Sequence, residues 1–294
     1  MLKNAHSGIT PTRNKPTTMT LLIVNADDLG IHPERDRGIF EAHARGIVCS
    51  ASLIVNGVSA RQAAERAITS GLPVGIHLNL SEGQSLTGTI PGLTDTRGQF
   101  PGKQGLRDAL QRSAVDGQGI RDELRTQVNR AREFGIDPDH LDSHQHFHLF
   151  PAMLRIVLDL AREEGIPAVR RSLPAEPAES DPHDVLGKEM RLYRSLAHET
   201  PALIAGASDI AMPDGLWGMP NLTNLDTERL CDLLEHIPPG RWELMVHPGY
   251  PAGEGFGGRQ RQLELEALLS TEVKATISRC AIRLISFGDL ACAS

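Results

Sequence analysis

Short runs of apolar, mostly β-branched residues alternate along this chain with longer segments of helical periodicity. The apolar runs predict strands at 21–25, 47–56, 72–80, 139–142, 166–170, 207–211, 241–246 and 281–286. The segments between them predict helices at 33–46, 59–69, 120–134, 152–164, 185–198, 227–236 and 260–279. Strands that alternate with helices form parallel sheets. Seven or eight such units predict a single α/β domain with a (β/α) barrel-like fold, and a doubly wound open sheet is the alternative.

Three stretches depart from this rhythm. Residues 1–18 are polar and lack the apolar core of a signal peptide, so we expect a disordered leader, with Met19 as an alternative start. The domain then covers residues 19–294. The Gly/Pro-rich stretch 81–119 is too long for a simple connection, and such loops are commonly functional or lid-like. The stretch 172–225 has the weakest pattern of the chain.

Composition and charge exclude several classes of partner. The 294 residues are 40% apolar and 23% charged, as in ordinary globular proteins. A formal net charge of −7 argues against nucleic acid or an anionic membrane surface as a partner. No apolar run approaches the roughly 18 residues that a membrane-spanning helix needs. The four cysteines are scattered without metal-binding spacing, which favours reduced thiols and a cytoplasmic protein.

Polar side chains collect where the predicted strands end. In parallel β/α folds the active site lies at the carboxyl ends of the strands. Ionisable or metal-ligating residues stand at five of these ends: Asp27 and Asp28, His77 and Asn79, Asp142 and His144, Arg170, and His247. Their shared position predicts one functional site on one rim of the sheet.

The stretch NADDLG places Asp27 and Asp28 side by side at the end of a buried strand. Two adjacent carboxylates there need a compensating positive charge. One aspartate with two neutral histidines is a common ligand set for a divalent ion, and such an ion keeps a carboxylate ionised. We therefore expect a bound ion to supply the charge. One aspartate then ligates it and the other accepts a proton from water, with His247 as a candidate acid.

These motifs resemble the YdjC-like carbohydrate deacetylase family, which includes chitooligosaccharide deacetylases and hopanoid-associated proteins. The matching pieces are LLIVNADDLG (21–30), GIVCSASLIVNG (46–57), GIHLNLSEGQSL (75–86), HLDSHQHFHLFP (140–151), MVHPGY (245–250) and LISFGDL (284–290). The first motif carries Leu29 where the family often has Phe. The resemblance extends from residue 20 to residue 290.

The resemblance implies a barrel-like fold and metal-dependent removal of an acetyl group from an N-acetylated sugar. It implies Mg²⁺, with Zn²⁺ as the alternative, bound by one aspartate of the pair, His77 and His144. By analogy with NodB-type polysaccharide deacetylases, Asp28 is the ligand and Asp27 the general base, and His247 protonates the leaving amine. A homodimer is also expected from the resemblance.

Further side chains are expected to bind the sugar. They are Arg170, Asp142, His146, Tyr250 and Trp217. Arg170 is the candidate to orient Asp27, with Arg171 as its neighbour and rival, and Asp142 is equally a candidate to orient a histidine. For Trp217 and Tyr250, core packing is the alternative to stacking on a sugar ring. A metal-dependent phosphoesterase or non-sugar amidase, and a sugar-binding protein without activity, are the competing functions.

Overall fold

The structure is a computed structural model that describes residues 19–112, 115–175, 187–222, 224–252 and 258–293, so the predicted leader lies outside it. Its centre is a parallel sheet with the strand order β5-β4-β3-β2-β1-β7-β6, and β8 pairs with β1. The strands are β1 (Thr20–Leu29), β2 (Ser50–Leu53), β3 (Val74–Leu78), β4 (His140–Ser143), β5 (Ala168–Val169), β6 (Gly215–Trp217), β7 (Gly240–Val246) and β8 (Ile282–Leu284). The predicted parallel α/β architecture is confirmed.

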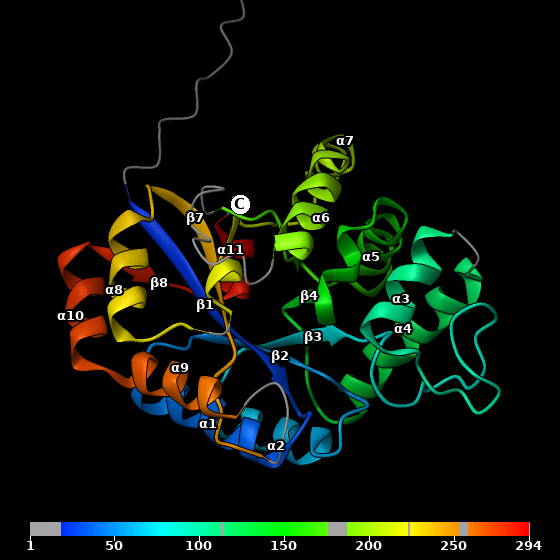
Figure 1. Ribbon diagram of the computed structural model, residues 1–294, viewed down its shortest axis with the longest axis horizontal. Helices are drawn as coiled ribbons and strands as arrows, with labels where there is room; N and C mark the ends of the chain where they lie inside the picture. The colour runs from blue at the N-terminus through cyan, green and yellow to red at the C-terminus, as the bar shows by residue number, and fades with distance from the viewer. Residues whose placement is uncertain (1–18, 113–114, 176–186, 223, 253–257, 294) are drawn as a thin grey trace, which may run out of the picture.

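Strand β1 lies in the middle of the sheet and pairs with three other strands (Figure 1). Along Thr20–Ala26 it pairs with β7. The opposite edge is shared: Thr20–Leu22 pair with β8, and the end of β1 from Asn25 onward pairs with β2. The strand is longer than the predicted 21–25 because its pairing with β2 resumes at Leu29, after an irregularity at the two aspartates.

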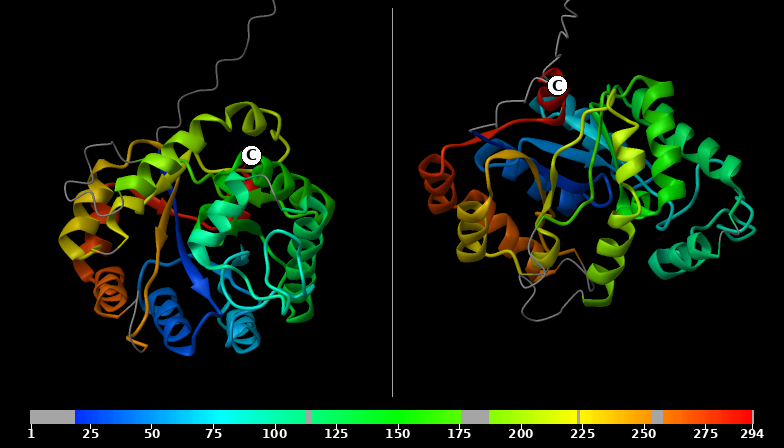
Figure 2. Two further views of the ribbon diagram at one scale, coloured as in Figure 1. Left: turned by 45° about the vertical axis from the view of Figure 1, so that its right-hand side comes forward. Right: turned by 90° about the horizontal axis from the view of Figure 1, so that it is seen from above.

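The sheet is strongly curled, as the two views of Figure 2 show, and backbone hydrogen bonds join its two edges. Beyond β5, Leu216 donates its N–H to the carbonyl of Leu173 at 2.8 Å, and the N–H of Ala175 donates back to Leu216 at 2.9 Å. These two bonds join the segment after β5 to β6. The prediction of a barrel-like fold is therefore confirmed as a half-barrel, and the isolated bridges Ala168–Ala211 and Pro174–Leu216 are the contacts at its open side.

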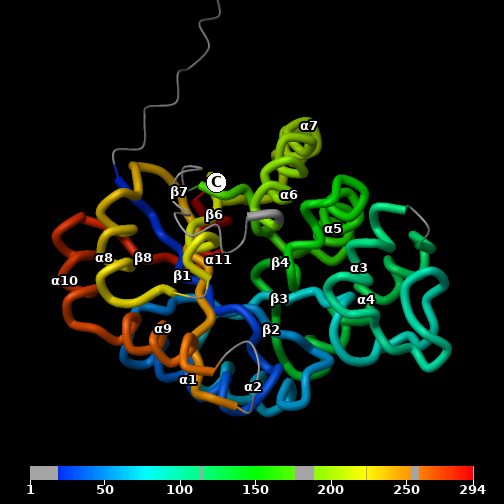
Figure 3. Tube along the Cα trace, viewed as in Figure 1, coloured from blue at the N-terminus to red at the C-terminus, as the bar shows by residue number. Residues whose placement is uncertain are grey.

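Helices surround the curled sheet, and the backbone trace in Figure 3 follows them from blue to red. They are α1 (Pro33–Arg45), α2 (Ala60–Ser70), α3 (Gly102–Gln111), α4 (Gly117–Glu133), η1 (His144–Leu149), α5 (Pro151–Glu164), α6 (Gly187–His198), α7 (Pro201–Ala205), η3 (Met219–Asn221), α8 (Thr227–His236), α9 (Arg259–Leu269), α10 (Thr271–Arg279) and α11 (Phe287–Cys292). No helix of the described ranges is long and apolar enough to cross a membrane.

The inner face of β1 shows how the barrel is filled. Alternation along a strand puts Ile23, Asn25 and Asp27 on one face. Ile23 packs there with Phe287 and Leu290 of α11, which covers one end of the barrel interior. The next two residues on the same face, Asn25 and Asp27, are polar and buried. The functional end of the barrel therefore begins where the apolar filling stops.

Several predicted elements were wrong. The stretch 207–211 is not a strand, apart from a one-residue bridge at Ala211, and β6 instead begins at Gly215, where the chain pairs with β7. The predicted helix 260–279 is two helices, because Ser270 is extended (φ −58°, ψ 138°) and its side chain accepts the N–H of Glu272 to begin α10.

The stretch 81–119, predicted to be a loop, contains α3 and the first turn of α4. Residues 185–186 of the predicted helix 185–198 lie outside the described ranges, and α6 covers the rest. Short helices α7 and α11 were not predicted. Their five and six residues are too few for a clear helical period.

Candidate metal centre and catalytic cavity

A break in the regularity of β1 brings its two aspartates to the same place. Neighbouring residues of a strand normally face opposite sides of the sheet. Between Ala26 and Leu29 the register with β2 shifts, and Asp28 adopts a left-handed backbone with φ +67°. Asp27 and Asp28 consequently both line one cavity. Such a conformation costs about 1–3 kcal/mol in a residue other than glycine, so the surrounding structure holds it in place.

The cavity lies at the carboxyl ends of the strands and has a volume of about 640 Å³. This is a typical size for a pocket that binds a small molecule. Its lining residues come from strands β1, β3 and β7, from η1 and η3, from helices α1, α3, α6 and α9, and from the loops that follow β1, β3, η3 and β7. They are Asp27, Asp28, Ile31, Arg35, His77, Glu82, Lys103, His144, Gln145, His146, Glu189, Tyr193, Met219, Leu222, Met245, His247 and Arg261.

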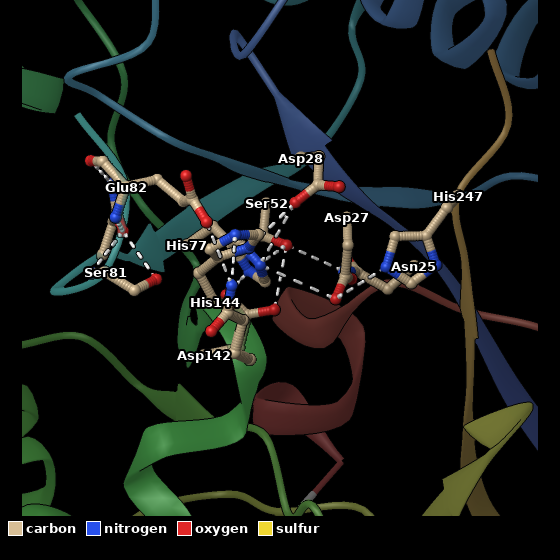
Figure 4. A network of polar contacts seen from close by, with 12 residues as sticks. Asn25, Asp27, Asp28, Ser52, His77, Ser81, Glu82, Asp142, His144 and His247 are labelled. Carbon is tan, nitrogen blue, oxygen red and sulfur yellow. Dashed lines mark hydrogen bonds and ion pairs between the residues drawn. The ribbon is translucent and has the colours of Figure 1, made fainter. Parts of the chain in front are cut away.

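Asp28, His77 and His144 form a compact group at one end of this cavity (Figure 4). Oδ1 of Asp28 lies 3.1 Å from Nδ1 of His144 and 3.7 Å from Nε2 of His77. Ligands about 2.1 Å from a common ion lie about 3.0 Å apart at octahedral and about 3.4 Å apart at tetrahedral angles. The spacing therefore suits one divalent ion.

Asp142 fixes the ring of His77. Nδ1 of His77 lies 2.8 Å from Oδ1 of Asp142, and the other oxygen of Asp142 accepts the hydroxyl of Ser52 at 2.9 Å. All three side chains are buried. A carboxylate behind a histidine selects the tautomer whose far nitrogen is available to a metal. Burial alone would lower the pKa of His77, but Asp142 and Asp27 outweigh it and raise that pKa to about 9.

The residues present fit a metal, and they favour Asp28 over Asp27 as its ligand. Oδ1 of Asp28 is buried and accepts no hydrogen bond from the described part of the chain. Asp27, His77 and Asp142 form a second group of suitable spacing. There, however, the guanidinium of Arg170 already contacts Asp27 and Asp142. Asp28 is therefore the aspartate whose carboxylate has an oxygen without a hydrogen bond from the described residues.

Arg170 supplies the positive charge that holds Asp27. Its Nη1 and Nη2 donate to the two oxygens of Asp27 at 2.7 and 2.6 Å, and Nη2 also reaches Glu243 at 2.6 Å. Burial alone would raise the pKa of Asp27, but Arg170 and His77 hold it below its usual range. The expectation that a bound ion compensates both aspartates was therefore wrong for Asp27, whose partner is a side chain 143 residues away.

Asp28 also has a cationic partner. Nη2 of Arg261, on α9, donates to its Oδ2 at 2.9 Å, which leaves Oδ1 facing the histidines. Burial would raise the pKa of Asp28, but His144 and Arg261 keep it well below the usual value. Arg35 of α1 lines the same part of the cavity, and burial together with Arg261 lowers its pKa to about 10.

His247 directly follows β7, and Figure 4 shows it on the opposite side of Asp27 from His77. Its Nε2 lies 4.0 Å from Oδ2 of Asp27, and its backbone N–H donates to Glu264 at 2.8 Å. Burial, reinforced by the charge of Arg261, lowers the pKa of the imidazole to about 4. His247 is therefore neutral at pH 7.

Not all predicted sugar contacts line the cavity. His146 does, whereas Arg170 and Asp142 lie behind the metal group with their side chains fully buried. Trp217 is buried and packs edge-on against Trp242. The hydroxyl of Tyr250 donates to Glu41 on α1, away from the lining residues.

Other residues contact the two aspartates or line the cavity without having been predicted. Glu243 and Asn25 are polar residues inside apolar strands, and that break in the pattern was a usable signal for both. Asn25 donates to Asp27 at 2.9 Å. Lys103, Glu189 and Tyr193 line the far wall from α3 and α6, the stretches with the weakest pattern, where no signal marked them.

The chain is similar in sequence and in fold to several known proteins. The family model described as YdjC-like protein matches residues 21–279. A carbohydrate deacetylase of Mus musculus is 33% identical over 92% of this chain and 94% of its own length. The chitooligosaccharide deacetylase of Serratia marcescens is 32% identical over 92% of this chain and 99% of its own. A crystal structure from Enterococcus faecalis V583, named there for a proposed cellobiose-phosphate cleavage, superposes with a TM-score of 0.76 at 26% identity, covering 92% of this chain and 99% of that one.

Proposed function

Because the chain belongs to the YdjC-like protein family, we propose that it is a metal-dependent hydrolase that removes the acetyl group from an N-acetylated sugar. The observation that carries the proposal is the unequal pairing of the two aspartates. Asp28 keeps a buried oxygen toward His77 and His144, and Asp27 is held on both oxygens by Arg170. The carbohydrate deacetylases among the relatives support a sugar as the substrate.

We assign Asp28, His77 and His144 as the metal ligands. A divalent ion bound by them would polarise the acetamide carbonyl and acidify the attacking water. Mg²⁺ is our first choice on the family resemblance, and Zn²⁺ is the second because one carboxylate with two imidazoles is a ligand set that Zn²⁺ commonly uses. Asp142 and Ser52 hold His77 in the ligating tautomer.

Asp27 is the general base in this account. Arg170 and Asn25 fix its carboxylate at the edge of the cavity, so it is positioned to take the proton of the attacking water. His247 starts neutral and must gain a proton before it acts as an acid. Asp27, whose Oδ2 lies 4.0 Å from Nε2 of His247, is the source we propose, and the departing amine is the final acceptor.

The test is acetate release from a panel of N-acetylated sugars. Protein stripped with chelator and reloaded with Mg²⁺ or Zn²⁺ is incubated with chitooligosaccharides and single N-acetylated amino sugars. A phosphoester and a non-sugar acetamide are included as the competing substrate classes. Acetate from at least one sugar, lost on chelation and restored by metal, supports the proposal. Turnover of only the phosphoester or the non-sugar amide refutes it. A cytoplasmic location and a homodimer stay predictions.

A further inference from the structure

Behind the cavity wall, four buried side chains form a continuous hydrogen-bonded chain. Nδ1 of His146 lies 3.1 Å from the hydroxyl of Ser172, and that hydroxyl lies 3.0 Å from Nε2 of His148. Nδ1 of His148 lies 2.6 Å from the hydroxyl of Ser143. His146 lines the cavity, whereas the other three lie behind it. The chain therefore starts at the cavity surface and ends inside the domain.

The backbone that carries His146 is strained. Ser143 ends β4, Ser172 follows β5, and both histidines belong to η1. Within η1, Gln145 and His146 have left-handed backbones, with φ of 58° and 56°. These two consecutive residues let His144 face the metal group and His146 turn its Nδ1 toward Ser172. Positive φ in residues other than glycine commonly marks functional sites.

The direction of the protons along the chain follows from Ser143. Its oxygen accepts the backbone N–H of His148 at 3.2 Å, so its own proton is free to donate. Among the described residues its only acceptor is Nδ1 of His148. Nδ1 of His148 is then an acceptor, and the proton of that ring is on Nε2, for which the hydroxyl of Ser172 and the backbone carbonyl of Arg170 are the acceptors.

The direction of the hydrogen bonds closer to the cavity follows in the same way. Ser172 accepts from His148, so its hydroxyl donates to Nδ1 of His146, and the ring proton of His146 is on Nε2. The opposite direction would make Ser143 accept twice and leave its proton without an acceptor in a buried place, which is costly. A doubly protonated His146 would also carry a proton on Nε2. Nε2 is a donor both in the favoured direction and in the doubly protonated ring, and only the costly opposite direction leaves it without a proton.

We propose that the chain Ser143–His148–Ser172 sets His146 as a fixed hydrogen-bond donor, through Nε2–H, to an oxygen of the substrate. Naming that oxygen as one of a sugar rests on the proposed function; the donor state of His146 does not. The ring of His146 packs edge-on against Tyr193 of α6, with 5.4 Å between centroids, and both residues line the cavity. The contact we propose is with the bound substrate, and Ser172 and His148 are positioning residues.

The direct test is the tautomer of His146, read by long-range ¹H–¹⁵N correlation spectra of histidine-labelled protein. The His146→Gln spectrum assigns the signal. The proposal predicts a protonated Nε2 and an unprotonated Nδ1 in both His146 and His148. A proton on Nδ1 of His146 with a bare Nε2 overturns it. This readout needs no substrate, so it remains decisive even if no sugar is deacetylated.

A matched pair of variants tests the donor in the reaction. His146→Gln keeps an N–H at a similar reach, and His146→Met has similar length without a donor. We expect the KM of His146→Met to rise about five- to tenfold with little change in kcat, and the KM of His146→Gln to stay closer to wild type. Equal KM values for wild type and His146→Met overturn the contact. Unchanged metal affinity in both variants is the control.

Substitutions of Ser172 test whether its hydroxyl holds the ring of His146 in place. Ser172→Ala removes the hydroxyl that holds the ring, and Ser172→Thr retains it. The Nδ1 signal of His146 should shift in Ser172→Ala and return toward the wild-type position in Ser172→Thr. An identical His146 signal in wild type and Ser172→Ala would contradict the proposed hydrogen bond between Ser172 and His146.

Discussion

Arg170 binds Asp27 through two parallel hydrogen bonds, Nη1 to Oδ2 at 2.7 Å and Nη2 to Oδ1 at 2.6 Å. The pair is fully buried, and Arg170 also contacts Asp142 and Glu243. One guanidinium thus faces three carboxylates. Burial would lower the pKa of Arg170, but Asp142 and Asp27 keep it well above its ordinary value. Arg170 is therefore charged at every pH at which the protein folds.

Removing that charge should affect both stability and turnover. Arg170→Met leaves the carboxylates of Asp27, Asp142 and Glu243 buried without their cation, which we expect to cost about 3–5 kcal/mol of unfolding free energy. Acetate release should fall about 100-fold in the fraction that folds, because Asp27 loses its fixed orientation. Urea unfolding and acetate assays check this.

The neighbouring residue is the matched control for Arg170. Arg171 is partly exposed and makes none of these contacts. We expect Arg171→Met to change the unfolding free energy by less than about 0.5 kcal/mol. Equal effects of the two substitutions would contradict the role given to Arg170.

Asp142 should matter for metal affinity without being a ligand. Asp142→Asn keeps the shape of the side chain and weakens its hold on Nδ1 of His77. We expect metal affinity to fall about 10- to 100-fold, as for other residues that orient a ligating histidine. Titration calorimetry with Zn²⁺ measures it. An affinity equal to wild type would show that Asp142 does not orient the ligand.

Loss of either histidine ligand should be more severe than loss of Asp142. His77→Ala and His144→Ala each remove a nitrogen that faces Oδ1 of Asp28. The metal content of the purified variants should drop to background. His236→Ala, at an exposed site on α8, is the control and should bind metal like wild type. Retained metal in both ligand variants would remove the proposed centre.

Gly38 of α1 packs against the loop that carries His247. A Cβ at Gly38 of α1 would lie 2.5 Å from the Cα of Gly249, two residues beyond His247. Gly38→Ala should therefore displace this loop, cost about 1–3 kcal/mol and lower acetate release. Gly117→Ala meets no neighbour and is the control. Wild-type activity in Gly38→Ala would show that the loop position does not matter.

The parts predictable from sequence are those with local signals. The alternation of apolar runs and helical segments predicted the parallel sheet, and residues at strand ends predicted that Asp27, Asp28, His77 and His144 would meet. Their chemical roles stay predictions.

The partners of the aspartates were not predictable in the same way. Arg170 is 143 residues from Asp27, and Arg261 is 233 residues from Asp28, so no local pattern connects them. The left-handed backbone at Asp28 also has no sequence signal, since Asp commonly occupies ordinary strand ends. It coincides with the register shift between β1 and β2 from Ala26 to Leu29.

The central claim is that the two aspartates have different roles, and substituting each by Asn tests it most directly. Metal content and acetate release are measured for Asp27→Asn and Asp28→Asn side by side, each beside wild type. We predict that Asp27→Asn retains the metal and releases no acetate, whereas Asp28→Asn loses the metal. Loss of metal from Asp27→Asn, with retention in Asp28→Asn, would contradict the account.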